Sequence, residues 1–170
     1  MLHRPDPYSD AGTSPRVLDV THVVASLSRD AGGPSYSVPA LAAALAQRGA
    51  TVRVRTVETD DAPPDAGDDV ARCAHPTAGG PLGRLLRASP SLKAALAADA
   101  RDNSILHTHG LWLMPNIYPA RLKRRSDRPL KVVHSPRGML APAALGISAW
   151  KKRPFWWLLQ KSALEVADCI

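Results

Sequence analysis

Two histidines, His107 and His109, lie two residues apart in the segment I-L-H-T-H-G. If this segment is a strand, both side chains share one of its faces, because strand side chains alternate between faces. A neutral imidazole at a strand end can exchange a hydrogen bond with a sugar hydroxyl near pH 7, and Trp112 adds a flat apolar ring on which a sugar can stack. No third ligand with suitable spacing is visible, so we expect no metal. The alternative is a core histidine beside a packing tryptophan.

Two glycine-containing segments could bring the backbone close to an anionic ligand. Gly32 and Gly33 precede a segment with helical periodicity, so a sharp turn there would present the positive end of a helix to an anion such as a diphosphate. Arg137 and Gly138 follow a predicted strand and a proline. A guanidinium can donate two parallel hydrogen bonds to a phosphate or carboxylate. A plain tight turn, and a turn arginine that contacts only backbone, are the alternatives.

The segment K-K-R-P-F-W-W-L-L, residues 151–159, combines cations with aromatic rings. Such a segment can rest on an anionic membrane surface, where each basic residue contributes about 1 kcal/mol. Its apolar residues can equally face the sheet, with Trp156, Leu159 and Ala163 as core positions. We favour core packing and keep peripheral membrane contact as the alternative.

Strand and helix patterns alternate along the chain and determine where these residues lie. Runs rich in β-branched residues predict buried strands at residues 17–23, 52–57, 105–108 and 130–134. Apolar residues at helical spacing predict helices at residues 37–49, 82–100, 113–125 and 149–167. We expect Ser89 to cap a new helix within the second of these, and Gly49 to end the first at positive φ. Residues 58–81 read as loop with one short strand near Ala71, and residues 167–170 as the start of another strand.

This order predicts an α/β fold, a Rossmann-like open parallel sheet with helices on both faces. Ligands of such sheets bind at the carboxyl ends of the strands, where we expect Gly33, His109, Trp112 and Arg137 to line one cleft. We expect residues 1–15 to be a disordered N-terminal tail and residues 16–170 to form the domain.

Composition and motifs exclude several classes of protein. The chain has 170 residues, 45% of them hydrophobic, and a net charge of +7, which suits a soluble domain with anionic ligands or, equally, solvated basic helix faces. No run approaches the roughly 18 apolar residues of a membrane span, and the polar N-terminus lacks a secretory signal, so we expect a cytoplasmic protein. Two distant cysteines predict no disulfide. The motifs of nicotinamide dinucleotide sites, serine hydrolases, zinc proteases, P-loops and nucleic-acid binders are absent, so we expect no cofactor and no nucleic acid.

Four segments in one order resemble the N-terminal domain of family-four, GT-B-type retaining glycosyltransferases of the bacterial polysaccharide kind. They are G-G-P-x-x-S-V-P-A-L-A-A-A-L-A-Q-R-G, H-T-H-G-L-W-x-x-P-N, S-P-R-G-M-L-x-P-x-A-L and W-K-K-R-x-x-W-W-L. The resemblance runs from about residue 16 to residue 170. It implies two Rossmann-like domains that face a cleft, an N-terminal one for the acceptor and a C-terminal one for the nucleotide sugar, with no metal in the chemistry.

The same resemblance implies roles for individual residues. His109 would touch the transferred sugar as the catalytic residue, and Gly32 and Gly33 would lie near the donor diphosphate. Trp112, Arg137 and Gly138 would line the acceptor side.

We therefore expect the acceptor-side half of a glycosyltransferase that moves a hexosyl unit from a nucleotide sugar to a glycan or glycolipid in polysaccharide or cell-envelope assembly. The family's donor-domain Arg/Lys pair and E-x7-E segment do not occur before Ile170. We expect the chain to stop before that C-terminal donor domain and to be inactive alone, because the reaction needs positioned charge from both domains. The alternative is a non-catalytic Rossmann-like module that binds a phosphorylated ligand or a protein partner.

Overall fold

The computed structural model describes residues 17–57 and 70–170. The tail predicted at residues 1–15 and residues 58–69 of the predicted loop lie outside the described residues. Five strands form one parallel sheet in the order β3-β2-β1-β4-β5. They are β1 (Asp19–Val24), β2 (Thr51–Val57), β3 (Ala71–His75), β4 (Ile105–His109) and β5 (Lys131–Ser135). The predicted Rossmann-like parallel sheet is confirmed, including the short strand near Ala71.

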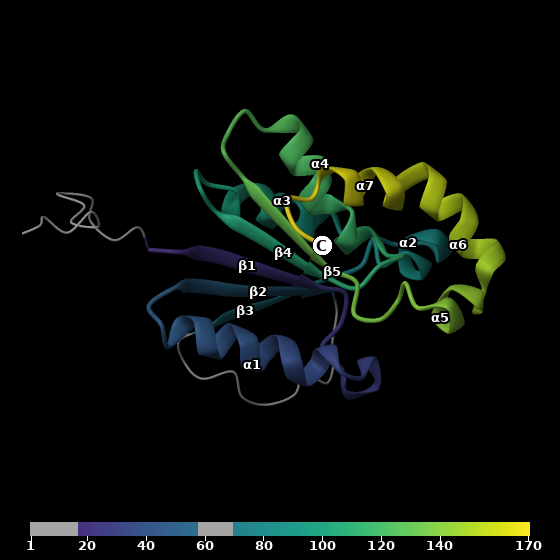
Figure 1. Cartoon of the computed structure of the whole chain (residues 1–170), viewed down its shortest axis with the longest axis horizontal. Helices are drawn as coiled ribbons and strands as arrows, with labels where there is room; N and C mark the ends of the chain where they lie inside the picture. Colours follow the sequence, from purple (N-terminus) through teal and green to yellow (C-terminus); the bar gives the residue numbers. More distant parts are fainter. Residues whose placement is uncertain (1–16, 58–69) are drawn as a thin grey trace, which may run out of the picture.

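Helices cover both faces of this sheet (Figure 1). Helix α1 (Pro34–Ala46) lies below it, and α3 (Pro90–Asp99), α4 (Tyr118–Arg125) and α7 (Lys161–Val166) lie above it. The short helices α2 (Pro81–Leu85), α5 (Pro142–Gly146) and α6 (Ala149–Phe155) lie beyond the carboxyl ends of the strands. Among the residues described, no helix is both long and apolar enough to cross a bilayer.

The core has two parts because side chains of a strand alternate between the two faces of the sheet. Val24 packs with Val38 and Ala42 of α1, whereas its neighbour Val23 packs with Leu92 and Leu96 of α3. Both leucines are fully buried, and each such side chain contributes about 1.5–3 kcal/mol by leaving water. Strands β1, β2, β4 and β5 are buried or half-buried along most of their length, while the edge strand β3 is largely exposed.

The predicted helices are confirmed with shifted boundaries. Ser89 caps α3 by accepting a hydrogen bond from the Leu92 amide at 3.2 Å, and Gly49 has the expected positive φ of 86°. The helix predicted at residues 113–125 is a 3₁₀ turn (Met114–Asn116) followed by α4. The helix predicted at 149–167 contains a π-helical turn (Trp156–Gln160) between α6 and α7. Pro154 stands just before that turn, and its missing N–H disturbs the i→i−4 ladder.

The last residues pair with the sheet at one point only. Cys169 forms a parallel bridge with Val133 of β5, so the strand start predicted at residues 167–170 is a single bridge among the residues described.

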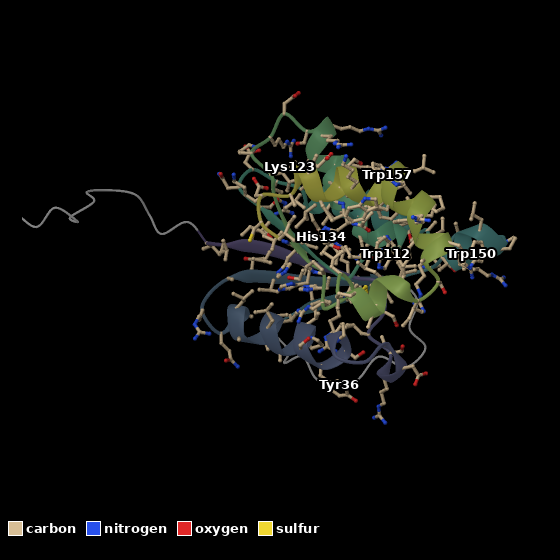
Figure 2. All side chains as sticks on the ribbon, turned by 45° about the vertical axis from the view of Figure 1, so that its right-hand side comes forward. Tyr36, Trp112, Lys123, His134, Trp150 and Trp157 are labelled. Carbon is tan, nitrogen blue, oxygen red and sulfur yellow. The ribbon has the colours of Figure 1, made fainter. Side chains whose placement is uncertain are left out.

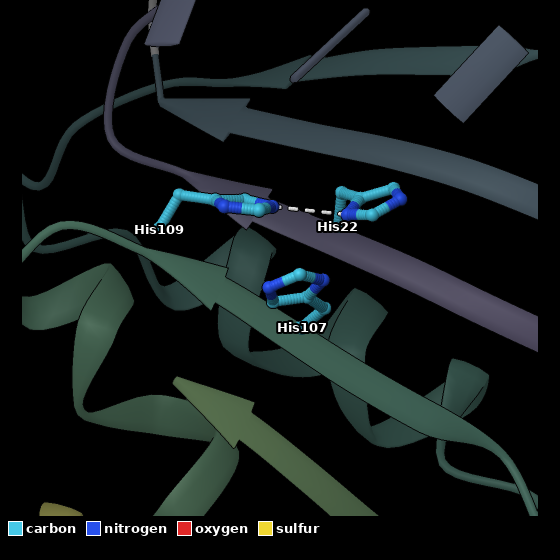
Figure 3. A group of neighbouring side chains, drawn as sticks. All are labelled: His22, His107 and His109. Atoms are coloured by element: carbon cyan, nitrogen blue, oxygen red, sulfur yellow. Dashed lines mark hydrogen bonds between the residues drawn. The ribbon is translucent and has the colours of Figure 1, made fainter. Parts of the chain in front are cut away.

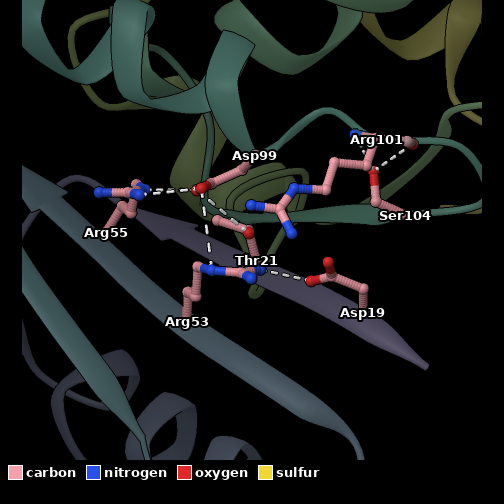
Figure 4. A network of polar contacts seen from close by, with 7 residues as sticks. All are labelled: Asp19, Thr21, Arg53, Arg55, Asp99, Arg101 and Ser104. Atoms are coloured by element: carbon pink, nitrogen blue, oxygen red, sulfur yellow. Dashed lines mark hydrogen bonds and ion pairs between the residues drawn. The ribbon is translucent and has the colours of Figure 1, made fainter. Parts of the chain in front are cut away.

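A charged network fixes α3 to the sheet on the face opposite the histidine-bearing positions of β1 and β4 (Figure 4). Asp99, at the end of α3, accepts from Arg55 through both carboxylate oxygens and from the Thr21 hydroxyl at 3.3 Å. Arg53 lies between Asp99 and Asp19 and pairs with both. Since every buried charge here has a partner, we interpret the network as structural.

Candidate functional site

Three distant segments meet at the carboxyl edge of the sheet. In the strand register Val24 lies beside His109, and His109 lies beside Ser135, so the loops after β1, β4 and β5 begin side by side. Two non-glycine residues in these loops have positive φ, Trp112 at 70° and Arg137 at 53°. That conformation costs an L-residue roughly 1 kcal/mol or more and persists only where surrounding contacts hold it.

Three histidines form a cluster on the face of the sheet that α1 partly covers (Figure 3). The rings of His107 and His109 have centroids 4.1 Å apart, as the two-residue spacing predicted. The third is His22 of β1, whose Nδ1 lies 3.0 Å from Nε2 of His109. Sequence reasoning did not single out His22, because only the pairing of β1 with β4 places it beside His107.

Arg137 determines how the protons of this cluster are arranged. Its Nη2 and Nε lie 3.0 and 3.4 Å from Nδ1 of His109. A guanidinium can only donate, so Nδ1 accepts and a neutral His109 carries its proton on Nε2. That Nε2–H then donates to Nδ1 of His22, which leaves the His22 proton on Nε2. This nitrogen is buried and has no hydrogen-bond partner among the residues described.

The cluster is neutral at physiological pH. Burial, reinforced by the charges of His107, His22 and Arg137, lowers the pKa of His109 from 6.5 to about 2. Burial is also the main reason why the pKa values of His22 and His107 fall to about 4, with Arg137 contributing to both. His109 can therefore give and receive hydrogen bonds near pH 7, but its imidazole is too weak a base to store a proton there.

The same three side chains have the composition of a metal site. Their ligand nitrogens lie within 4.8 Å of one another, so the structure supplies the third ligand that the sequence spacing did not reveal. The guanidinium of Arg137 argues against a cation here. A metal on Nε2 of His109 would move the proton to Nδ1, where it would face the donors of Arg137. We assign the cluster to hydrogen bonding, and the absence of a metal stays a prediction.

Hydrogen bonds continue from His109 to the glycine loop before α1. Nη1 of Arg137 donates to the Ser37 hydroxyl at 3.2 Å, and that hydroxyl donates to the Gly33 carbonyl at 3.0 Å. Gly33, Ser37, Arg137, His109 and His22 thus form one chain of contacts that spans two loops, helix α1 and two strands. Arg137 itself is solvent-exposed. Its guanidinium therefore holds the buried His109 imidazole by hydrogen bonds and is still accessible to a ligand.

The glycines of the site leave room at the edge of the sheet. A side chain at Gly32 or Gly33 would meet nothing within 4 Å, and Gly32 has a φ of 75°. Gly138, at 76°, is equally open. The first amides of α1 are already engaged, since those of Tyr36 and Ser37 donate to the Gly33 carbonyl. Binding of a diphosphate at this loop would therefore depend more on the unobstructed space at the glycines and on Arg137 than on free helix amides.

Buried polar groups hold the end of β4 in place. Asn116 is 1% exposed, and its Nδ2 donates to the Thr108 hydroxyl at 3.0 Å and the His109 carbonyl at 2.9 Å. On the far side, Nε2 of His134 pairs with the Gly110 carbonyl at 3.0 Å. The His109 backbone is thus fixed independently of its imidazole.

Trp112 belongs to a neighbouring cavity instead of the histidine cluster. Its amide donates to Oε1 of Gln160 at 3.0 Å, its ring lies 6.1 Å from that of Trp156, and Lys152 sits 5.6 Å above it. The indole Nε1 is buried without a partner among the described residues. The cavity measures about 370 Å³ and is lined by Trp112, Leu140, Leu145, Ala149, Lys152, Arg153, Trp156 and Trp157. Its apolar, aromatic walls with two cations suit an amphiphilic ligand.

Comparison with known proteins gives one family. The sequence profile of the family described as Glycosyl transferase 4-like domain matches residues 32–170. A search of curated proteins finds no significant match.

Proposed function

The chain belongs to the glycosyl transferase 4-like family, and on that premise we propose that it provides the acceptor side of a transferase that moves a hexosyl unit from a nucleotide sugar to a glycan or glycolipid. The observation that supports this most is the chain of hydrogen bonds from Gly33 through Arg137 to His109 and His22. It presents an exposed cation beside a neutral imidazole at the edge where parallel sheets bind ligands.

Each group has a part in the proposed reaction. In this proposal the Arg137 guanidinium, which the resemblance places on the acceptor side, pairs instead with the diphosphate of the donor or with the negative charge that grows on it as the sugar leaves. His109 contributes a polar nitrogen to a sugar hydroxyl, because its low pKa keeps it uncharged in a region that already holds Arg137. To do so, His109 must exchange one of its two present partners, Arg137 or His22, for the substrate.

The acceptor lies on the side of Trp112 in this proposal. Sugar rings stack on indole faces, and the apolar walls of the adjacent cavity would take the less polar part of a glycolipid. The donor nucleotide is held by a second domain, and activity in polysaccharide or cell-envelope assembly follows from the acceptor class.

Binding and transfer can be tested separately. Saturation-transfer NMR on the 170-residue chain should detect oligosaccharide binding that Trp112→Ala weakens, while the exposed control Tyr36→Ala leaves it unchanged. The chain alone should give no measurable transfer from any of a panel of nucleotide sugars. Turnover by the chain alone would contradict the proposal that a second domain holds the donor nucleotide. Binding of phosphorylated ligands without any binding of glycans would favour a non-catalytic module.

A further inference from the structure

The helix that runs from α6 through the π-helical turn into α7 exposes an apolar stripe on its outer side. Trp150 is 74% exposed, Trp157 is 70% exposed and Leu158 is 75% exposed. Trp150 and Trp157 are seven residues apart, two helical turns, so both rings emerge on the same side. Figure 2 shows the two tryptophans along this outer helix, on the side of the sheet opposite Tyr36. Single exposed apolar residues are ordinary, but two indoles and a leucine on one helical stripe are not.

The inner side of the same helix already has its partners. Ala163 packs with Ile117 and Ala120, and Phe155 and Leu159 pack against that cluster. Gln160 is fully buried and accepts from the Trp112 amide. Core packing therefore accounts for the inner side, as the sequence favoured. Trp150 and Trp157 each line a cavity beside Trp112 but remain largely exposed.

Cations border the apolar stripe. Lys151 lies 5.1 Å from the Trp150 ring and Lys161 lies 5.2 Å from the Trp157 ring, and Arg153 is exposed between them. From Arg128 to Leu164 the sequence contains no aspartate or glutamate. The electrostatic potential over this surface is thus positive, and its charge complement is an anionic partner.

We propose that this outer helical face, formed by Trp150, Trp157 and Leu158 with Lys151, Arg153 and Lys161, docks on an anionic lipid bilayer. Indole rings prefer the boundary between headgroups and acyl chains, and lysine and arginine stems reach from there to phosphate. A bilayer fits both observations, since it offers an apolar layer directly beneath a negatively charged one. A protein partner would need a matching apolar groove with an acidic rim. The proposal does not rest on the transferase function, because it concerns attachment alone.

The experiment is sedimentation of the purified 170-residue chain with vesicles of phosphatidylcholine alone and of phosphatidylcholine mixed with phosphatidylglycerol. We expect binding to the mixed vesicles that weakens with added salt, with a blue shift in tryptophan emission. Lys151→Gln with Arg153→Gln should weaken binding by about twenty-five-fold, since each basic residue near an anionic surface contributes about fivefold. Trp150→Ala with Trp157→Ala should weaken it by about tenfold or more.

Matched controls lie on the α1 side of the molecule. Arg29→Gln with Arg48→Gln removes the same charge, and Tyr36→Ala removes an exposed aromatic ring; neither should change vesicle binding. All these residues are exposed, so thermal melting should show that the variants remain folded. Equal binding to both vesicle types, or equal losses in the control variants, would overturn the proposal. So would a concentration-dependent dimer that the tryptophan variants abolish while the chain ignores vesicles, because the occupant would then be a second copy.

Discussion

Arg137 donates to Nδ1 of His109 from 3.0 Å while His22 lies 3.0 Å from the opposite nitrogen of the same ring. Both nitrogens of His109 are thus engaged, and the guanidinium decides which of them is protonated. An exposed arginine in the loop after β5 thereby determines the hydrogen-bonding state of a buried histidine at the end of β4.

The first prediction concerns this tautomer. Two-bond ¹⁵N–¹H NMR spectra at neutral pH should show His109 as the neutral form protonated on Nε2. Arg137→Met removes the donors and should allow the Nδ1–H form to appear, whereas Arg137→Lys should keep Nε2–H dominant because an ammonium also only donates. A wild-type His109 protonated on Nδ1, or on both nitrogens, would show that Arg137 does not set the state of the ring.

The second prediction is that the chain loses stability as the pH falls from 6.5 towards about 4. The folded pKa values of His22 and His107 lie below the ordinary 6.5. Between pH 6.5 and about 4 the unfolded chain therefore binds protons that the folded chain does not bind. The stabilisation is fully present above pH 6.5 and declines through the folded pKa values. For the fully buried His22, the loss by pH 5 is about 2 kcal/mol.

Urea unfolding across that pH range measures the effect. His22→Asn should flatten the slope of unfolding free energy against pH, whatever it does to absolute stability. Asp168→Asn is the control: hydrogen bonds from Lys123, Val132 and Lys131 outweigh partial burial and lower the Asp168 pKa from 3.8 to about 2, so its contribution is lost only at lower pH. Stability that is independent of pH between 6.5 and 4 would contradict the neutral buried cluster.

The third prediction is that the Asp99 network contributes to stability and not to ligand binding. Asp99→Asn should lower the free energy of unfolding by about 2–4 kcal/mol, because it leaves the partly buried Arg55 without its charged partner. Asp102→Asn should cost less than about 0.5 kcal/mol, since its pair with Arg128 is 3.9 Å long and mostly exposed. Ligand affinity measured well below the melting temperature should be unchanged in both, because the network lies on the face of the sheet opposite the histidine cluster.

The sequence predicts the sheet well because β-branched runs and glycine or proline boundaries are local signals. It also predicts that His109 and Arg137 meet, since parallel strands collect their loops at one edge. His22 and Ser37 could not be found in this way, because register and the path of the Arg137 side chain are properties of the folded chain. The position of Trp112 also depends on the folded backbone. Its positive φ directs it to Gln160 and Trp156, away from the histidines that precede it.

The last prediction concerns His109 in a protein that joins this domain to a nucleotide-sugar-binding domain. We expect His109→Ala to lower kcat/KM by about tenfold to a hundredfold, in line with losing a hydrogen bond made more strongly in the transition state. The melting temperature should fall by only a few degrees, because Asn116 holds the His109 backbone without using its imidazole.

The matched control is His134→Ala, another buried histidine that pairs with the Gly110 carbonyl on the opposite face of the sheet. Its imidazole supports the loop after β4, so we expect a loss of stability with kcat/KM per folded molecule nearly unchanged. Measuring both quantities for both variants distinguishes the roles. If His109→Ala keeps the wild-type rate, or loses only what unfolding explains, then His109 is a structural histidine and the chemistry lies with Arg137 and the donor domain.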